Sequence, residues 1–377
     1  MTVNQPFTPS NFHFNRQVLD CVIGGVSAID TPRLNIHTRD EAKQFITAYG
    51  YDLDSPGDTE LLWGIHRRAV ALIQEQFLNE GENIPMDVAD PTTLGDLSKL
   101  LILASSRLEA HHELQKWSCA VLRVMHVFVH LRNDLFSAFR DQIQASLLKP
   151  LQDAIVVDDI AGRSVLGPNE PGGGIQLHKF EIKPFKTTAS SAIKLLARSE
   201  RVALSLLDKI GVRFVTRSLF DSFRVVRFLV DQHLISYPHI IPDQSANTLY
   251  PINLFLEVME ELKAIEKRGE VVDDNVVREA LMAHLAESKD QANYLEKLNE
   301  FSGPDYRFLK FINRKLVTVT IGEGGDKKPF SFFYPYEVQI VDVETYSRNM
   351  SGPMAHDAYK DRQRRKARAR VLGEHLR

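Results

Sequence analysis

The residues best suited to do chemistry lie in the second half of the chain. In KTTASSAIK, residues 186–194, Lys186, Ser190 and Lys194 recur every four residues, so a helix would place them on one face. Two ammonium groups and a hydroxyl on one face can hold a chain of phosphates, and Arg198 and Arg201 follow closely. An ordinary solvated helix face explains the same spacing, so this motif needs support from others.

Two carboxylates fall at the start of, or within, predicted strands. Asp208 precedes the apolar run at 211–215, which contains Arg213, and Glu337 lies in YEVQI. A strand end holds a carboxylate rigidly beside water and phosphate, which suits Mg²⁺. Glu337 and Gln339 are two residues apart and therefore face the same side of their strand. Either a salt bridge or a metal with its substrate must satisfy Glu337.

Two further patterns are weaker candidates. His126 and His130 lie one helical turn apart, with His111 and His112 before them, and two imidazoles at this spacing can share a metal. No HExxH glutamate lies between them, so roles in packing or at the surface fit better. GPNEPGGG, residues 167–174, is predicted to be a loop and not a P-loop, because a strand follows it.

The elements that must position these residues differ between the two halves of the chain. Apolar residues recur at helical spacing over about 60–149, and Pro150 is predicted to end the last of these helices. The later part alternates between strand and helix patterns. Strands are predicted at 175–182, with one irregular step, and at 211–215, and helices at 190–207, 219–234 and 254–265. Residues 316–322 and 330–343 predict a β-hairpin.

These motifs, together with HDAYK at 356–360, resemble the synthetase domain of the RelA/SpoT-homologue alarmone enzymes. The matching pieces of that family are a basic-Ser-Lys helix, a D-x4-R strand entry, an E-[VI]-Q-I-R-T strand and an H-x2-YK helix, in the same order. The resemblance covers about residues 175–360, roughly half of the chain. Each motif is weak alone, but four in the right order are moderately specific.

The resemblance implies a nucleotidyltransferase-like sheet on which Mg²⁺-bound ATP gives its β,γ-pyrophosphate to the 3′-hydroxyl of a guanosine nucleotide. Asp208 and Glu337 would be the catalytic carboxylates and the metal ligands, and Glu337 would also be a candidate base for the attacking hydroxyl. The residues that would bind ATP are Lys186, Ser190, Lys194 and Arg213. Phosphoryl-type transfer depends on positioning and charge neutralisation, which Mg²⁺, Lys and Arg supply.

The acceptor side departs from the family. The family has a G-Y-[QR]-S-[IL]-H stretch whose Tyr stacks on guanine, and the best counterpart here is SGPDYRFLK at 302–310. Tyr306 and Arg307 match, whereas Phe308 and Lys310 replace the Ser and the His. Tyr250 is a second candidate for the stacking Tyr, but it lies farther from the Glu strand.

Other acceptor-side positions are assigned by the same resemblance. Gln339 and His356 join the predicted acceptor-binding set. After EVQI, Val341 and Asp342 stand where the family has Arg and Thr, which puts the identity of the acceptor in doubt. The ordered His, His-Asp and Asp set of the family's hydrolase domain is absent from the first third, so no alarmone hydrolysis is predicted.

Composition excludes several classes of protein. Forty-six Lys and Arg against 49 Asp and Glu give a net charge of −3, so no global basic field attracts nucleic acid or anionic lipid. Binding to RNA would have to be local, through the basic tail at 360–370, for which a solvated helix is the other interpretation. Two cysteines suit a reducing compartment, and without a signal peptide or an apolar span the chain is predicted to be cytoplasmic, with no membrane partner.

The sequence therefore predicts an α+β protein. A helical N-terminal domain (1–150) would precede a synthetase-like nucleotidyltransferase domain (151–345) with a mixed β-sheet flanked by helices, an acidic helical insertion (243–300) and a basic C-terminal helix (346–377). The predicted function is that of an ATP-dependent pyrophosphokinase similar to (p)ppGpp synthetases. The alternatives are a catalytically inactive nucleotide-binding or protein-interaction module, and a pyrophosphokinase acting on an RNA end. The sequence leaves open whether the protein forms an oligomer.

Overall fold

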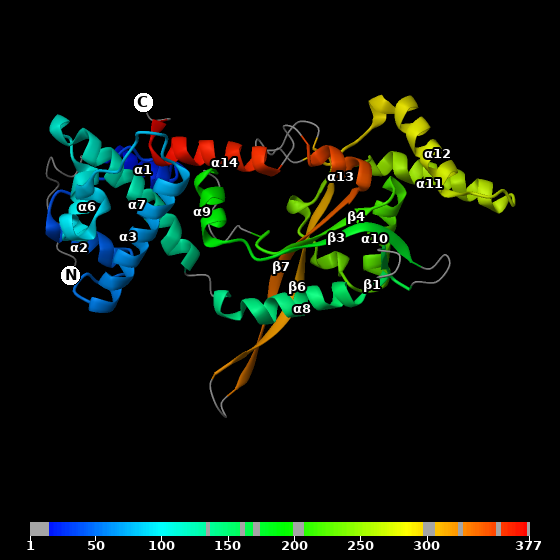
Figure 1. The fold of residues 1–377 in the computed structure, drawn as a ribbon, viewed down its shortest axis with the longest axis horizontal. Helices are drawn as coiled ribbons and strands as arrows, with labels where there is room; N and C mark the ends of the chain where they lie inside the picture. The colour runs from blue at the N-terminus through cyan, green and yellow to red at the C-terminus, as the bar shows by residue number, and fades with distance from the viewer. Residues whose placement is uncertain are drawn as a thin grey trace, which may run out of the picture. The chain divides into compact units, whose positions relative to one another are not determined.

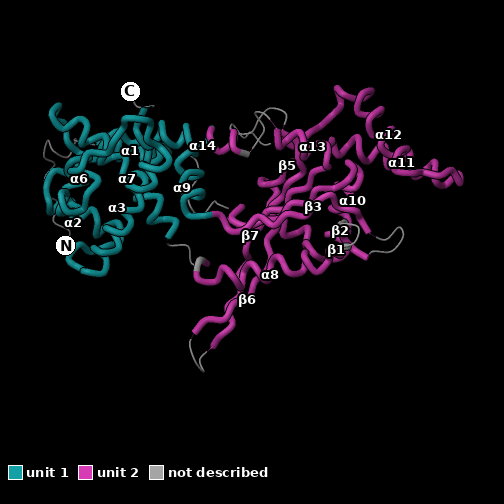
Figure 2. Tube along the Cα trace, viewed as in Figure 1, with its two compact units in different colours: residues 1–134, 187–205, 362–377 teal, residues 135–186, 206–361 magenta. Residues whose placement is uncertain are grey.

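The computed structural model describes residues 15–132, 136–158, 163–168, 174–198, 207–296, 306–322, 327–351 and 356–374. Across these residues the chain forms a mixed α and β structure with a seven-stranded sheet (Figure 1). It divides into two compact units (Figure 2). The helical unit takes residues 1–134, 187–205 and 362–377, and the sheet unit takes residues 135–186 and 206–361.

This division differs from the domain boundaries predicted at 150 and 345. Helix α8 (Arg140–Asp153) belongs to the sheet unit, although the sequence placed it in the helical domain. Helix α9 (Thr188–Leu196) and the end of α14 (His356–Val371) belong to the helical unit. The chain therefore contributes three separate segments to the helical unit.

Polar side chains mark where the helices of the helical unit begin. Thr38 starts α2 (Arg39–Ala48) with a capping box: its hydroxyl accepts from the Glu41 amide, and the Glu41 carboxylate accepts from the Thr38 amide. Ser55 caps α3 (Pro56–Gln76), and Asp96 caps α6 (Leu97–Ser105). Apart from α9 and α14, the helices of this unit are α1 (Arg16–Val22), η2 (Ala28–Asp30), α2 (Arg39–Ala48), α3 (Pro56–Gln76), α4 (Met86–Ala89), α5 (Pro91–Leu94), α6 (Leu97–Ser105), η3 (Glu109–His111) and α7 (His112–Arg132).

Arginine side chains close the C-terminal ends of three helices in this unit. Arg368 donates to the carbonyl of Phe77, just after α3 (2.7 Å), and Arg370 donates to the carbonyls of the last two residues of α9 (3.3 and 3.1 Å). Arg123 donates to the carbonyl of the last residue of α14 (2.6 Å). The last carbonyls of a helix have no partner within it, and cations are favourable there.

The basic C-terminal segment is therefore not the solvated helix that the sequence predicts. Gln363, Ala367 and Arg370 are buried, and Arg368 also makes a two-pronged ion pair with Glu82 (2.7 and 2.8 Å). Periodicity did not reveal this burial because the buried face of α14 is mostly polar. The partners of Arg368 and Arg370 on the other helices of this unit lie between 174 and 340 residues away in sequence.

The sheet unit is built on a mixed sheet with the strand order β1-β2-β3-β4-β7-β6-β5. Strand β4 pairs parallel with β7, and all other neighbours are antiparallel. The strands are β1 (Ile155–Asp158), β2 (Arg163–Leu166), β3 (Ile175–Lys183), β4 (Gly211–Thr216), β5 (Ala246–Asn247), β6 (Leu309–Ile321) and β7 (Lys328–Asp342). The remaining helices, apart from α8, are η4 (Ser137–Phe139), α10 (Leu219–Asp231), η6 (Tyr237–His239), η7 (Pro242–Gln244), α11 (Ile252–Lys267), α12 (Asp274–Glu287), η8 (Lys289–Gln291) and α13 (Val343–Asn349).

The two faces of the central strands have opposite chemistry. Val212 and Phe214 of β4, with Val338 and Ile340 of β7, are fully buried and pack with apolar residues of α8 and α10. Of the alternate positions, Arg213, Glu337 and Gln339 carry charged or polar side chains on the other face, whereas Gly211 has no side chain and Val215 and Val341 are apolar and buried. Because side chains alternate along a strand, the apolar face anchors the sheet and leaves the polar face for a site.

Proline 150 lies inside α8 and does not end it, so that prediction is wrong. Proline has no amide N–H, so the carbonyl of Ser146 loses its helical partner. The Lys315 ammonium of β6 donates to this carbonyl (3.0 Å). A strand far along the chain thus supplies the hydrogen bond that Pro150 cannot.

Several local predictions are confirmed. Strand β3 has its irregular step between Leu177 and Lys179, and β6 and β7 form the predicted hairpin. Helices α10 and α11 cover most of their predicted ranges. The predicted helix at 190–207 ends at Leu196, and residues 199–206 and most of GPNEPGGG lie outside the described residues. No helix in the described part of the chain is long and apolar enough to cross a membrane.

Candidate functional site

A glycine allows two charged residues on non-adjacent strands to meet. Lys183 at the end of β3 pairs in register with Gly211 of β4, and Gly211 pairs with Glu337 of β7. A Cβ at Gly211 would lie 2.6 Å from the Glu337 carbonyl oxygen and 2.9 Å from its Cβ. With no side chain between them, the Lys183 Nζ reaches across β4 to Glu337 Oε1 (2.8 Å).

Glu337 is a largely buried carboxylate that two lysines keep ionised. Burial raises its pKa, but the ammonium groups of Lys183 and Lys310 outweigh this effect and lower the pKa to about 2. Lys310 Nζ lies 4.0 Å from Glu337 Oε2, and only 13% of the Glu337 side chain is exposed. Of the two partners that the sequence left open for Glu337, the described residues supply the salt bridge.

A second row of polar residues runs beside the first. Gln339 faces the same side as Glu337, because its amide oxygen accepts from Lys183 (2.7 Å) and from Arg213 Nε (2.9 Å). Its amide nitrogen is thereby turned toward the Tyr306 hydroxyl (3.4 Å). Arg213 also donates to Glu181 of β3 (2.9 Å), so this row crosses three strands.

Glu181 fixes the outer end of this row. Its carboxylate accepts from the Tyr346 hydroxyl of α13 (2.8 Å) and pairs with Lys179 (2.7 Å). Burial raises the pKa of Glu181, but Lys179, Tyr346 and Arg213 together lower it. The guanidinium of Arg213 is held between Glu181, Gln339 and the Tyr346 ring, 5.7 Å from the ring centroid.

Asp208 and Lys186 form another carboxylate–ammonium pair in the sheet unit. Asp208 lies in the segment that enters β4, and its Oδ2 accepts from Lys186 Nζ (2.5 Å). The Lys186 amide also donates to the carbonyl of Lys209 (3.0 Å), which fixes the two segments side by side. The negative charge of Asp208 acts to raise the Glu337 pKa, so the two carboxylates sense each other.

The predicted helix face of Lys186, Ser190 and Lys194 is only partly formed. Thr187 caps α9 through its hydroxyl, and the helix starts at Thr188, so Lys186 precedes it. Ser190 lies in the first turn, where its amide donates to Thr187 Oγ1 (3.2 Å), and Lys194 lies in the last turn. Lys186 belongs to the sheet unit, whereas Ser190 and Lys194 belong to the helical unit.

The structure separates the two candidate stacking tyrosines. Tyr250 is 1% exposed, and its hydroxyl donates to the Leu281 carbonyl (2.8 Å), so its ring has no open face. Tyr306 is partly exposed and packs at an angle on Phe308, with ring centroids 5.3 Å apart. Tyr306 is therefore the only one of the two that keeps accessible surface.

The other acceptor-side residues have different placements. The backbone of Arg307 is tied to Asn349, whose amide oxygen accepts from the Arg307 N–H (3.2 Å) and whose amide nitrogen donates to its carbonyl (2.7 Å). Lys310 lies in β6, opposite Gln339 in register. His356 begins α14, and its side chain lies outside what the structure describes.

Sequence reasoning missed Lys183, Glu181 and Tyr346. Lys183 and Glu181 alternate along β3 as Glu337 and Gln339 do along β7, and this two-residue spacing of charges was the available signal. Their partners could not be found from spacing, because the register between β3 and β4 and the gap at Gly211 are properties of the assembled sheet.

The donor set limits the metals that this site could hold. Within the described residues, no three Asp, Glu, His or Cys side chains form a metal-binding group. Mg²⁺ is commonly bound by one or two carboxylates, with water and substrate phosphates completing its shell. Asp208 and Glu337 fit that pattern and do not fit a metal held by protein alone.

The described histidines of the helical unit make no such group. The rings of His126 and His130 lie 4.5 Å apart, and Tyr49 contacts both through its hydroxyl. Burial, followed by the nearby His130 and Arg370, lowers the pKa of His126 to about 4. A neutral imidazole packed against a tyrosine agrees with the packing role.

Comparisons with known proteins assign the chain to no family. No protein-family profile and no curated protein matches the chain. The geometry of the polar face must therefore carry any functional argument.

Proposed function

We propose that the sheet unit binds an Mg²⁺-nucleoside triphosphate and transfers its β,γ-pyrophosphoryl group to the 3′-hydroxyl of a nucleotide, on a nucleotidyltransferase-like sheet. The observation that carries the proposal is the pair of carboxylate–lysine contacts, Glu337–Lys183 and Asp208–Lys186, near the point where the parallel pairing of β4 with β7 begins. The RelA/SpoT-like order of motifs supports the same reaction.

The charges around the two carboxylates suit an anionic substrate. Among the described residues, five cations pair with three carboxylates, which leaves an excess of two positive charges; the eight groups are Lys179, Lys183, Lys186, Arg213, Lys310, Asp208, Glu337 and Glu181. Bound Mg²⁺ would neutralise negative charge that develops on the phosphates. With Asp208 and Glu337 turned to the metal, Lys183 and Lys186 would be released to phosphate oxygens.

The proposed transfer is a single displacement at phosphorus. The 3′-oxygen of the acceptor forms a bond to the β-phosphorus of ATP, and the bond from that phosphorus to the oxygen bridging the α-phosphate breaks. AMP leaves with the bridging oxygen, and the hydroxyl proton is lost to a base. A carboxylate with a pKa of about 2 is a poor proton acceptor at neutral pH, so Glu337 is assigned to charge and metal binding and not to the base.

Two observations bear on the acceptor. Asp342, which replaces the family's Thr, caps α13 by accepting from the Thr345 amide (3.0 Å), so this position has a structural role. Arg368 and Arg370 of the basic tail are engaged inside the helical unit, which removes much of the support for an RNA acceptor. A free nucleotide that stacks on Tyr306 is the favoured acceptor.

A second candidate is a nucleotide-binding module without catalysis. Two observations favour it. The Tyr306 hydroxyl, on the candidate stacking residue, is already engaged by Gln339. Asp342, which replaces the family's Thr on the acceptor side, is engaged in capping a helix. Binding of ATP without AMP release would distinguish it from the enzyme.

The test incubates the full chain with Mg²⁺ and γ-labelled ATP, and with GDP, GTP or tRNA in parallel. We expect AMP and a labelled guanosine nucleotide. Glu337→Gln should lower the rate by about 100-fold or more, because it removes one of two charges at the metal. Glu344→Gln, the same substitution at an exposed position of α13, is the matched control.

Each possible result of this test favours one function or contradicts the proposal. ATP binding by equilibrium dialysis without product from any acceptor would support the non-catalytic module. Label on tRNA alone would move the reaction to RNA. Absence of ATP binding, or full activity in a folded Glu337→Gln variant, would contradict the proposal.

A further inference from the structure

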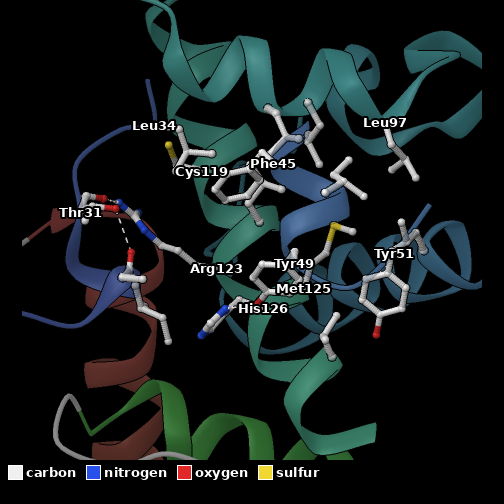
Figure 3. Close-up of a pocket in the computed structure, with 18 of the residues that line it drawn as sticks. Thr31, Leu34, Phe45, Tyr49, Tyr51, Leu97, Cys119, Arg123, Met125 and His126 are labelled. Atoms are coloured by element: carbon white, nitrogen blue, oxygen red, sulfur yellow. Dashed lines mark hydrogen bonds between the residues drawn. The ribbon is translucent and has the colours of Figure 1, made fainter. Parts of the chain in front are cut away.

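The helical unit contains a largely apolar cavity of about 190 Å³ (Figure 3). Its wall is formed by side chains of η2 and the segment after it, of α2, α6 and α7, by one residue of α3, and by Tyr51 between α2 and α3. Phe45 and Tyr49 line it and are 41% and 37% exposed, which places them at its mouth. Leu100 and Leu101 line its buried part.

A buried cation on the wall lacks an anionic partner. Arg123 is 7% exposed and donates to the carbonyls of Thr31 (2.7 Å) and Val371 (2.6 Å). Among the described residues Arg123 forms no ion pair: the negative charge of Asp30 acts on it from nearby, but that carboxylate is paired with Arg370. Burial lowers the Arg123 pKa, which reflects the cost of keeping this charge away from water.

The remaining charged group on the wall also favours a negatively charged ligand. Arg33 lines the cavity and is exposed, and none of the lining side chains is acidic. Figure 3 shows Arg123 extending toward Thr31 on one side, while Tyr49, Met125 and His126 lie together on another. Tyr49 and His126 hydrogen-bond to each other, so that side of the cavity needs no charged group from a ligand.

We infer that this cavity binds a small apolar carboxylate, such as a medium-chain fatty acid, with its hydrocarbon part against the leucines and its carboxylate toward Arg33 and Arg123. An apolar cavity of about 150 Å³ is known to stay dry and to accept benzene, so a space of this size and lining suits a hydrocarbon group. An empty cavity of this kind destabilises a fold in proportion to its volume, and a ligand would remove that penalty. The carboxylate would partner a buried cation that has only carbonyl partners.

The experiment uses the full chain, with octanoate as the probe and 1-octanol as its uncharged counterpart. Both tryptophans, Trp63 and Trp117, lie in the helical unit, so tryptophan fluorescence follows the melting of that unit alone. Octanoate should raise the melting temperature saturably, since a ligand that binds only the folded state stabilises it. Its affinity should exceed that of octanol by roughly five-fold.

Two variants with matched controls locate the site. Leu122→Phe fills the cavity from α7 and should abolish binding, whereas Leu114→Phe, on the same helix but outside the lining, should leave it unchanged. Arg33→Met should reduce the preference for octanoate over octanol, with Arg123 retaining part of it, whereas the exposed Arg107→Met should leave the preference unchanged.

The inference fails if octanoate gives no saturable shift, if octanol binds as tightly, or if a folded Leu122→Phe variant still binds. Should Leu122→Phe not fold, the Arg33→Met comparison decides: an unchanged octanoate affinity would overturn the assignment. The cavity and the candidate nucleotide site belong to different units, so either proposal can fail without the other.

Discussion

Cations in the two units have different kinds of partners. In the sheet unit, Lys183, Lys186 and Arg213 contact carboxylates or an amide on the exposed side of the strands. In the helical unit, Arg123, Arg368 and Arg370 each donate to backbone carbonyls where helices end, and Arg368 and Arg370 add ion pairs with Glu82 and Asp30. The first arrangement can be exchanged for a ligand, because carboxylates and ammonium groups can each take another partner. The second cannot be exchanged without opening a helix end.

The largest expected effect tests the structural role of the helical unit's arginines. Arg370→Met would remove the two-pronged contact with Asp30 and leave that carboxylate without this partner, as well as uncapping α9. We expect a loss of about 3–5 kcal/mol in the free energy of unfolding. Chemical denaturation followed by tryptophan fluorescence measures it. Arg365→Met, at an exposed position of the same helix, should change stability by less than about 0.5 kcal/mol.

As the pH falls, the two units should lose stability in different pH ranges. The folded-state pKa of His126 is about 4 against its ordinary 6.5, so the unfolded chain binds the extra proton first. The stability that this group contributes is present above pH 6.5 and is lost as the pH falls from 6.5 to 4, by roughly 3 kcal/mol. Glu337 has a folded pKa of about 2 against 4.5, so its contribution is lost only between pH 4.5 and 2.

Two readouts compare these pH windows. Tryptophan fluorescence should report destabilisation of the helical unit at the higher pH, and hydrogen exchange of β4 and β7 peptides should report the sheet unit at the lower pH. His126→Gln should flatten the slope of the helical unit and leave that of the sheet unit unchanged. If both units lost stability in one window, the assigned pKa shifts would be refuted.

The smallest expected effect concerns an exception in the sheet unit. Lys315, like the arginines of the helical unit, serves a backbone carbonyl, that of Ser146 opposite Pro150. Lys315→Met should cost about 1 kcal/mol and raise the hydrogen exchange of α8 amides. Lys328→Met, exposed on β7 of the same hairpin, is the control. Equal protection of α8 in the two variants would show that Pro150 needs no such partner.

Sequence patterns predicted what depends on neighbours along the chain. The hairpin of β6 and β7, the irregular step in β3 and the shared face of Glu337 and Gln339 follow from alternation within one strand. These features need no knowledge of the partner strand. The sequence also predicts that Glu337 requires a partner, because a lone polar face in an apolar strand is costly.

Features that depend on distant contacts could not be read from the chain. Lys183 meets Glu337 only because Gly211 falls between them in register, and that register is set by the sheet. Pro150 is tolerated because a lysine 165 positions away fills its gap. The sequence predicts a solvated basic tail because the partners of Arg370, which are Asp30 and the end of α9, lie far away along the chain. No local pattern contains these partners.

The three-segment construction of the helical unit has a consequence for synthesis. Residues 362–371, which close α3 and α9 through Arg368 and Arg370, leave the ribosome only after the whole sheet unit has been made. The helices that are translated first therefore wait for their last partners while the later unit folds. A stop codon before Arg362 would consequently harm the part of the protein that is encoded earliest, and leave the strands encoded just before it intact.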